Sequence, residues 1–298
     1  MTDSDSLHRF VFEQLPIRGH LVHLNSAWKA LLERRSYPEA IRDTLGESVA
    51  ASVLLAATLK FTGHLSLQLQ GQGPMHLLLA QCTSNLGVRG LARYRRDSES
   101  RDLSVLSGEG QLTVTLDNKA AARDDEQRYQ GVVPLTGERL AQCLEGYFAN
   151  SEQLPTRLWL HADEHGVSGM LLQRLPAKSE HENLDIDDAW RRVQLIGDTL
   201  KDEELSKLSD REILRRLFNE DDVRLFEPQP VFFSCTCSHE RVSGMLQSLG
   251  KEEVDTILAE QGTVEVRCDF CNRAYQFDKV DVGRLFATAV APGGKTLH

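Results

Sequence analysis

The sequence has no long hydrophobic run, no N-terminal export signal and no excess of basic residues. Its longest run of apolar and small residues covers 48–59, well short of the ~20 residues that a membrane-spanning helix needs. The first five residues, Met-Thr-Asp-Ser-Asp, are acidic and lack the basic and apolar regions of a secretory signal. We therefore expect a cytoplasmic protein without a membrane partner.

Acidic residues outnumber basic ones, with 44 Asp and Glu against 34 Lys and Arg in 298 residues and a net charge of −10. A protein that follows nucleic-acid phosphates normally presents a basic surface, so this balance disfavours a nucleic-acid partner. Hydrophobic residues make up 41% of the chain, which is enough for a folded core and excludes wholesale disorder. The length favours two domains, or one large domain with an appendage.

Common catalytic motifs are also missing. The sequence contains neither a Walker-type phosphate loop nor an H-E-x-x-H metalloprotease motif. The G-x-G pairs at 71–73 and 108–110 lack a third glycine and open no helix, so they are typical of turns. His161 and His165 bracket Ala-Asp-Glu, which the surrounding pattern places at a solvated hairpin tip rather than in a metal site. We expect neither an enzyme nor a nucleotide partner.

Four of the six cysteines form two close pairs near the C-terminus. Cys235 and Cys237 flank one threonine, and Cys268 and Cys271 flank Asp-Phe some thirty residues later. Four thiolates form the ligand set for tetrahedral zinc, and a turn of the Cys-x-x-Cys type can aim backbone N–H groups at sulfur. The first pair is closer than the usual spacing. His239 is a possible substitute ligand, although four cysteines make it unnecessary.

A site whose four positions are all protein sulfur leaves no position for a reacting water. The pattern therefore indicates a structural or redox centre rather than a hydrolytic one. The other two cysteines have different surroundings: Cys82 ends an apolar strand pattern, and Cys143 lies on an apolar helix face. We interpret both as small buried hydrophobic residues.

Residues 1–178 are predicted to form an α+β layer domain. The near-helical spacing of apolar residues in 39–60 predicts a long and largely buried helix. Similar spacing in 137–150 predicts a second helix. Strict alternation of apolar and polar residues over 64–70 predicts a half-buried strand. Strands that cluster in hairpins beside a few long helices favour α+β over a doubly wound sheet. The further predicted strands cover 75–82, 87–94, 111–116, 128–134, 157–161 and 167–175.

Residues 179–234, the linker segment, are strongly charged. The stretch 178–227 holds 15 acidic and 9 basic side chains, yet it keeps apolar residues at helical spacing. Such a segment forms helices when a neighbouring surface covers its apolar stripe, whereas alone it buries too little to offset its backbone entropy. It is therefore a conditionally folded linker or a constitutive helical connector. The apolar positions are Trp190, Val193, Ile196, Leu200, Ile213, Leu214, Leu217 and Phe218.

Residues 235–298 are predicted to form a small C-terminal zinc-binding domain. Ser238 is placed to cap a helix that runs to about 247, and a second helix ends near Gly262. Short strands at 263–267 and 274–277 flank the second cysteine pair, so we expect this pair to lie in a hairpin.

At these residues the sequence resembles the heat-shock protein 33 family of redox-regulated holdase chaperones. The family pattern is Cys-x-Cys, a spacer of about thirty residues and then Cys-x-x-Cys at the C-terminus. The similarity covers essentially the whole chain. It extends to four N-terminal segments, 68–75 (QLQGQGPM), 129–133 (YQGVV), 147–156 (YFANSEQLPT) and 169–173 (GMLLQ).

The resemblance implies one zinc ion on Cys235, Cys237, Cys268 and Cys271 in the reduced, inactive state. It implies that oxidation pairs Cys235 with Cys237 and Cys268 with Cys271, releases zinc and unfolds the C-terminal region together with the linker segment. The exposed apolar surface would then hold unfolding client proteins without ATP, and the oxidised protein would be a homodimer. The client-binding surface cannot be transferred to named residues.

The energies agree with this scheme. Structural zinc contributes ~10–16 kcal/mol of apparent binding energy that is also folding energy. Disulfides within each pair would close loops of about three and four residues, which the chain-entropy relation values at roughly 1.6 and 1.9 kcal/mol. Replacing the bound zinc ion by the two disulfides therefore loses at least ~6 kcal/mol of folding free energy, which is comparable with the ~5–15 kcal/mol that stabilises a whole domain. We therefore expect oxidation to unfold the C-terminal domain.

Two other functions remain open on the residues alone. The first is a zinc-ribbon protein with a nucleic-acid-binding or regulatory role, although the last 64 residues hold 9 acidic and 7 basic side chains and no basic stripe. The second is a thiol-disulfide oxidoreductase that uses Cys268 and Cys271. Thioredoxin-type motifs open a helix after a strand, whereas this pair is predicted to lie in a hairpin.

Overall fold

The protein is represented by a computed structural model, which describes residues 5–33, 35–118, 128–176 and 185–287. The chain divides into two compact units, Met1–Ser234 and Cys235–His298, here called the N-terminal unit and the C-terminal unit. In the described part of the chain, no helix has both the length and the apolar character to cross a membrane.

Two sheets form the N-terminal unit. Sheet A has the order β10-β1-β2-β9-β8, with β11 pairing beside β10 on β1, and sheet B has the order β12-β5-β4-β3-β6-β7. Every pairing is antiparallel except β12 with β5. The strands of sheet A are β1 (Ser6–Phe12), β2 (Ile17–Leu24), β8 (Thr156–Ala162), β9 (Val167–Arg174), β10 (Val223–Leu225) and β11 (Gln229–Pro230). Those of sheet B are β3 (Gly63–Gln70), β4 (Met75–Thr83), β5 (Gly87–Tyr94), β6 (Gln111–Asn118), β7 (Arg128–Val133) and β12 (Phe232–Phe233).

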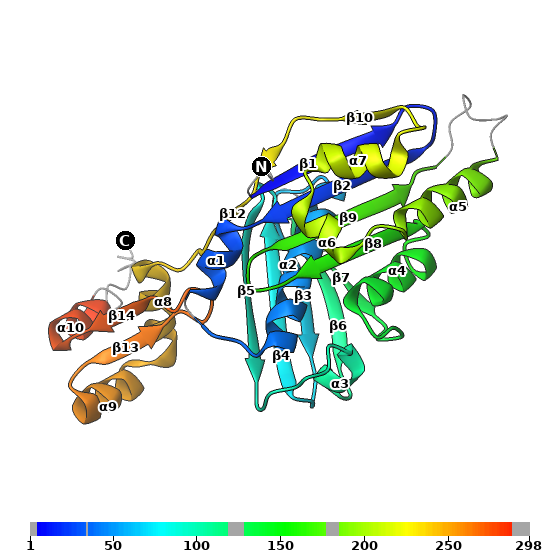
Figure 1. Cartoon of the computed structure of the whole chain (residues 1–298). Coiled ribbons are helices and arrows are strands. Elements are labelled where there is room, and N and C mark those ends of the chain that lie inside the picture. Colours follow the sequence, from blue (N-terminus) through cyan, green and yellow to red (C-terminus); the bar gives the residue numbers. More distant parts are fainter. Residues whose placement is uncertain (1–4, 34, 119–127, 177–184, 288–298) are drawn as a thin grey trace, which may run out of the picture. The chain divides into compact units, whose positions relative to one another are not determined.

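Helix α2 (Glu39–Thr58) lies between the two sheets and contacts strands of both (Figure 1). Because sheets cover it on two sides, 17 of its 20 residues are buried. The hydroxyl groups on its turns bond back to the helix, as when Thr44 donates to the carbonyl oxygen of Ala40 at 2.7 Å. Its buried Glu47 carboxylate pairs with the guanidinium groups of Arg101 and Arg139. The long buried helix predicted from the sequence is confirmed.

Three short helices complete the body of this unit: α1 (Ser26–Leu32), α3 (Leu103–Ser107) and α4 (Leu140–Asn150). Helix α4 confirms the second predicted helix, and the strands predicted between 64 and 175 correspond to β3–β9 within a few residues. The α+β class is also confirmed, since the strands form mostly antiparallel pairs with helices packed on them. Strands β1 and β2 and helix α1 were not predicted from the sequence.

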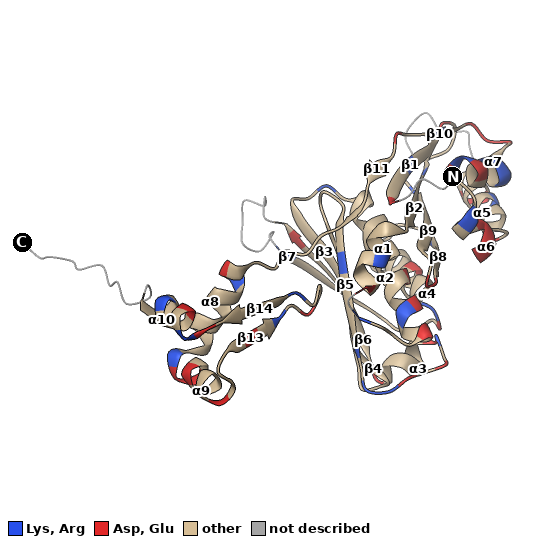
Figure 2. Cartoon of the chain, turned by 60° about the vertical axis from the view of Figure 1, so that its left-hand side comes forward, with Lys and Arg blue, Asp and Glu red and all other residues tan. Residues whose placement is uncertain are grey.

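The described part of the linker segment forms three helices, α5 (Ile186–Gly197), α6 (Asp202–Lys207) and α7 (Asp210–Phe218), followed by the short strands β10, β11 and β12 at the edges of the two sheets. The helices pack on the face of sheet A opposite α2. Successive side chains of a strand point to opposite faces. Phe10 and Phe12 of β1 belong to the hydrophobic cluster of the linker helices, whereas Leu7 belongs to the cluster around α2. These helices carry both basic and acidic residues (Figure 2). The three helices and the turn between α5 and α6 contribute Trp190, Val193, Leu200, Leu205, Ile213, Leu214, Leu217 and Phe218 to this cluster.

The C-terminal unit contains α8 (His239–Leu249), α9 (Lys251–Gln261), the hairpin strands β13 (Val264–Arg267) and β14 (Ala274–Phe277), and α10 (Lys279–Ala287). Both predicted helices, the Ser238 cap and the hairpin are confirmed, whereas α10 was not predicted. The core is small. Among the described residues its buried apolar members are Val242, Leu246, Val254, Val264, Tyr275, Phe277 and Val282.

Candidate metal centre

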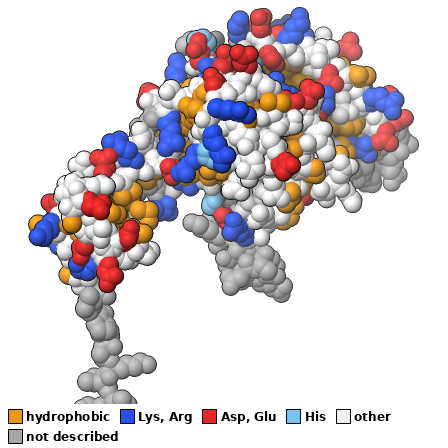
Figure 3. All heavy atoms as spheres, turned by 90° about the horizontal axis from the view of Figure 1, so that it is seen from below, with side chains coloured by type: hydrophobic (Ala, Val, Ile, Leu, Met, Phe, Trp, Pro, Cys, Tyr) orange, Lys and Arg blue, Asp and Glu red, His pale blue; other side chains and the backbone are white. Residues whose placement is uncertain are grey.

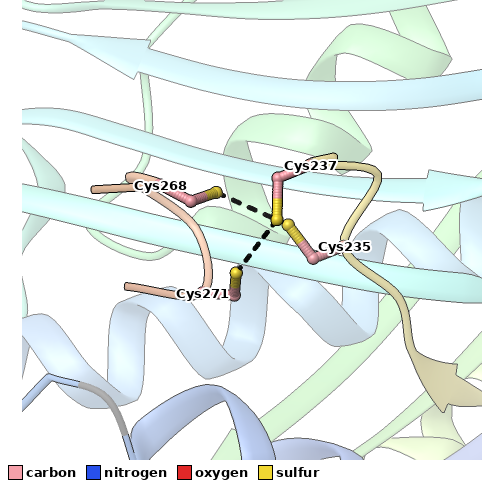
Figure 4. Close-up of side chains that lie close together, drawn as sticks. All are labelled: Cys235, Cys237, Cys268 and Cys271. Carbon is pink, nitrogen blue, oxygen red and sulfur yellow. Dashed lines mark hydrogen bonds between the residues drawn. The ribbon is translucent and has the colours of Figure 1, made fainter. Parts of the chain in front are cut away.

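The thiols of Cys235, Cys237, Cys268 and Cys271 converge in the C-terminal unit (Figure 4). All four sulfur atoms lie within 4.8 Å of one another. The Sγ atoms of Cys235 and Cys268 are 3.6 Å apart, and those of Cys237 and Cys271 are 3.3 Å apart. A tetrahedron with Zn–S bonds of ~2.3 Å has edges of about 3.8 Å. The four thiols therefore fit around one zinc ion.

The first pair is held by the start of helix α8. The Ser238 hydroxyl caps this helix by accepting a hydrogen bond from the Arg241 N–H at 3.2 Å. The Arg241 guanidinium donates to the carbonyl oxygen of Thr236 at 2.9 Å. These contacts fix the residues on both sides of Cys237, so the closer spacing of this pair is compatible with a shared site.

The second pair lies in the turn between β13 and β14. The Asn272 N–H donates to the Cys268 carbonyl oxygen at 2.8 Å, and the Cys268 N–H donates to the Arg273 carbonyl oxygen at 3.0 Å. Asn272 has a φ of 51°, a left-handed conformation that asparagine tolerates better than most residues. The chain thereby reverses within the Cys-x-x-Cys turn. This turn joins two strands and opens no helix, unlike the thioredoxin-type motif.

Backbone N–H groups point at two of the sulfur atoms. The N–H of Cys237 bonds to the Cys235 thiol, and the N–H of Arg273 bonds to the Cys271 thiol; each bond lowers the pKa of the thiol that it reaches. Such bonds favour the thiolate, the form that binds metal. The sequence predicted this feature for the second pair.

Burial works against ionisation at the same site. It raises the pKa of Cys235 to about 12 and also raises the pKa of Cys271. Burial opposes ionisation of Cys237 too, but the neighbouring side chains of Tyr275 and the other three cysteines outweigh it and lower its pKa to about 7. Four adjacent thiolates repel one another, so full ionisation needs a cation among them. The donor set thus fits a soft divalent ion such as zinc.

The other histidines and cysteines singled out in the sequence lie outside the four-cysteine cluster. The His239 ring packs on Phe277, with 4.6 Å between ring centroids, and is not part of the four-sulfur cluster. Cys82 and Cys143 are fully buried in the N-terminal unit, as predicted, and burial raises the pKa of Cys82 to about 12. His165 lies in the turn between β8 and β9, and His161 at the end of β8, which confirms the hairpin.

Comparison with known proteins shows the family to which the chain belongs. The family model described as "Hsp33 protein" matches residues 5–278. The chain belongs to the Hsp33 family. The Hsp33 relatives include the 33 kDa chaperonins of Methylobacillus flagellatus and Nitrosococcus oceani, each 46% identical over 100% of both chains. The 33 kDa chaperonin of Pseudomonas aeruginosa is 44% identical, again over 100% of both chains.

The fold is also that of a solved Hsp33 structure. The crystal structure of the 33 kDa chaperonin from Thermotoga maritima has a TM-score of 0.81 at 23% identity, and the match covers 96% of this chain and 99% of that one. The names of the Hsp33 relatives describe chaperones and not enzymes. This protein is accordingly a chaperone of the Hsp33 family.

Sequence reasoning missed two features of the Hsp33 metal centre. Tyr275 lies beside Cys237 and lowers the pKa of its thiol, and Asn272 supplies the left-handed residue of the turn. An asparagine directly after Cys-x-x-Cys is a usable turn signal. The tyrosine gave no signal, because its position in β14 predicts an ordinary strand residue.

Proposed function

We propose that this protein is a cytoplasmic, redox-regulated holdase that binds unfolding proteins and prevents their aggregation without ATP. In the reduced state one zinc ion is bound by Cys235, Cys237, Cys268 and Cys271, and the protein is inactive. Oxidation of the four thiols releases zinc, unfolds the C-terminal unit and the linker segment, and yields an active homodimer.

The convergence of four thiols from two distant segments carries this proposal. Zinc, when bound, holds four thiolates and so ties the segment before α8 to the β13–β14 turn. The seven buried apolar side chains among the described residues of this unit make a small core. Domains of this size usually need a metal, disulfides or a partner for stability. The fold of the C-terminal unit therefore depends on its cysteines remaining reduced.

The redox step takes place on the chain's own sulfur atoms. In the proposed pairing, Cys235 joins Cys237 and Cys268 joins Cys271. Each S–S bond forms as two thiols give up two electrons and two protons to a peroxide, which is reduced to two water molecules. Sulfur in a disulfide is a poor metal ligand compared with a thiolate, and the short loops return little stability. Oxidation thus removes the link that holds the unit together.

The linker helices give the switch its apolar surface. Seven of their side chains, with Leu200 between α5 and α6, are buried against sheet A, where they cover residues such as Phe10, Ile17 and Met170. Release of the helices would expose both sides of this contact, and large exposed apolar surfaces bind unfolded chains. Hydrophobic side chains already interrupt the charged surface of each unit in the docked state (Figure 3). They include Met245, Leu249 and Leu195, all more than half exposed.

The test is the aggregation of a thermally unfolding client protein, followed by light scattering at equimolar chaperone. We expect strong suppression by the oxidised, zinc-free protein and little by the reduced, zinc-loaded protein. Adding a thiol reductant together with zinc should reverse the effect. Equal suppression by both forms would remove redox control from the proposed function, and suppression by neither would contradict the holdase itself.

A further inference from the structure

Asp210 is an acidic residue inside an apolar interface. It is the first residue of α7 and its exposed fraction is 4%. The buried residues of this helix follow it at spacings of three, four, seven and eight, so Asp210 lies on the same helical face. That face packs on sheet A, where an unpartnered carboxylate would be costly. The buried residues in question are Ile213, Leu214, Leu217 and Phe218.

Two histidines of sheet A meet this carboxylate. Nδ1 of His8 on β1 lies 2.5 Å from one carboxylate oxygen, and Nε2 of His23 on β2 lies 2.7 Å from the other. Both histidines are about 95% buried, with exposed fractions of 5% and 4%. Each carboxylate oxygen thus has one ring nitrogen of the sheet at ion-pair distance. The linker segment is thus joined to the sheet by a two-point polar contact.

The contact keeps the carboxyl group ionised. Burial opposes the charge, but the adjacent side chains of His23 and His8 outweigh it and lower the pKa of Asp210. The helix N-terminus also favours an acid at this position. In the folded protein a buried anion is therefore matched by donors from the sheet, and it loses them if α7 moves away.

We propose that Asp210, His8 and His23 form a latch that holds α7, and with it the linker helices, on sheet A in the inactive state. The inference rests on the proposed function, in which these helices leave the sheet. A buried polar contact adds little net stability compared with apolar side chains of the same size, because its groups regain hydration when they separate. Loss of one partner is strongly destabilising, because it strands the other in the core.

The low net stability of this contact and the high cost of losing one of its partners both suit a switch. The apolar stripe alone would allow α7 to dock in neighbouring registers, whereas the latch is satisfied in one. Because its charge is rehydrated on release, the latch also makes the docked state less stable than an all-apolar interface would be. The linker helices are therefore held in one position without being held permanently.

The test is amide hydrogen exchange in the reduced, zinc-loaded, full-length protein. Asp210→Asn removes the charge, and Glu203→Gln is the matched control, because Glu203 is an exposed acid in the first turn of α6. We expect amides 211–218 to exchange at least about tenfold faster in Asp210→Asn and to remain within about twofold of wild type in Glu203→Gln. Unchanged exchange in Asp210→Asn, or equal acceleration in both variants, would overturn the latch.

A second pair of variants keeps the test decisive if Asp210→Asn does not fold. His23→Gln retains a donor near the position of Nε2, whereas His23→Leu removes it. We expect at least about tenfold faster exchange in His23→Leu and a much smaller change in His23→Gln. Wild-type exchange in both would refute the latch.

Client aggregation measured on the same samples separates the latch from the proposed function. Faster exchange together with suppression of aggregation before oxidation supports both. Faster exchange without any suppression supports the latch and contradicts the role of linker release in chaperone activity.

Discussion

The six cysteines share one side-chain chemistry but lie in two kinds of surroundings. Cys82 and Cys143 are enclosed by apolar side chains, and burial raises the pKa of both thiols, so they resist ionisation. The four C-terminal cysteines face one another, and two of them, Cys235 and Cys271, receive backbone N–H groups. Reactivity therefore follows position in the fold and not the number of thiols.

Cys271→Ser should abolish zinc binding. It removes one of four ligands, so affinity should fall by more than the ~10–100-fold that loss of a ligand's hydrogen-bonding partner costs. Zinc content after dialysis against a weak chelator measures the effect. The control is Cys143→Ser, whose buried thiol donates to the Gly137 carbonyl oxygen at 3.3 Å. This control should keep full zinc content and lose about 1 kcal/mol of stability; full zinc content in Cys271→Ser would contradict the assigned ligands.

The four-cysteine cluster was predictable residue by residue, but the contact of Asp210 with His8 and His23 was not. Cysteine spacing is read directly from the sequence, since few other patterns place four thiols in two close pairs. Asp210 occupies an apolar position of a charged helix, where an acid at the first turn is unremarkable. Its burial depends on His8 and His23, some two hundred residues earlier, so no local pattern could indicate it.

At the scale of elements, helix α2 and the linker helices differ in how their apolar faces are covered. Sheets enclose α2 on two sides, while α5–α7 are covered on one side only and expose their charged faces. An element covered on one side by a single neighbour has a lower free energy of local release. The linker helices are thus the part of the N-terminal unit best suited to detach.

Val193→Asp should detach α5 without oxidation. Val193 is fully buried against sheet A, and an unpaired carboxylate there should cost about 3 kcal/mol or more. The matched control is Leu195→Asp on the same helix, because Leu195 is 63% exposed. We expect the reduced Val193→Asp protein to suppress client aggregation and reduced Leu195→Asp to behave as wild type. Identical inactivity of the two reduced variants would argue against covered apolar surface as the basis of control.

The attachment of α6 should weaken slightly as pH rises. The Asp202 carboxylate, 3.7 Å from Nδ1 of His161, raises the pKa of His161 despite burial, and the Asp163 carboxylate adds to the effect. A raised histidine pKa means that the stabilising contribution is complete below about 6.5 and is lost as pH rises through the folded value. The contact is half-buried, so the change should not exceed about 0.5 kcal/mol.

Exchange protection of α6 measures this change. Protection factors, corrected for intrinsic rates, should fall by up to about twofold between pH 6 and 8.5. Asp202→Asn should remove most of the dependence. A protection factor that rises over this range would show that the sign is wrong.

The elements whose apolar residues repeat with the period of a helix or strand were predicted from the sequence, and elements without such a repeat were not. Residues 64–70 alternate because one face of β3 is less buried than the other, and the helical spacing of 137–150 reflects the one-sided packing of α4. Strand β2 has helices on both faces and is buried at nearly every residue, so alternation disappears. Its buried His20 and His23 further conceal the strand, since histidine is uncommon in a core.

At the scale of the whole molecule, the two units differ in what stabilises them. The N-terminal unit has two sheets, a central helix and a large apolar cluster, so it should remain folded without metal. The C-terminal unit has a small apolar core and a four-thiol centre. A chemical event at four sulfur atoms can therefore unfold the C-terminal unit while the two sheets and helix α2 of the N-terminal unit stay folded. In the proposed switch only the linker segment of the N-terminal unit is released along with it.

The central claim is that loss of the metal link unfolds the C-terminal unit. The most direct measurement is a peroxide titration of the reduced, zinc-loaded protein that records zinc release, loss of free thiols and far-ultraviolet circular dichroism on the same samples. We predict that zinc release and the loss of helical signal rise together with the oxidation of four thiols per chain, while Cys82 and Cys143 remain reduced. Complete zinc release with an unchanged dichroism spectrum would contradict the account.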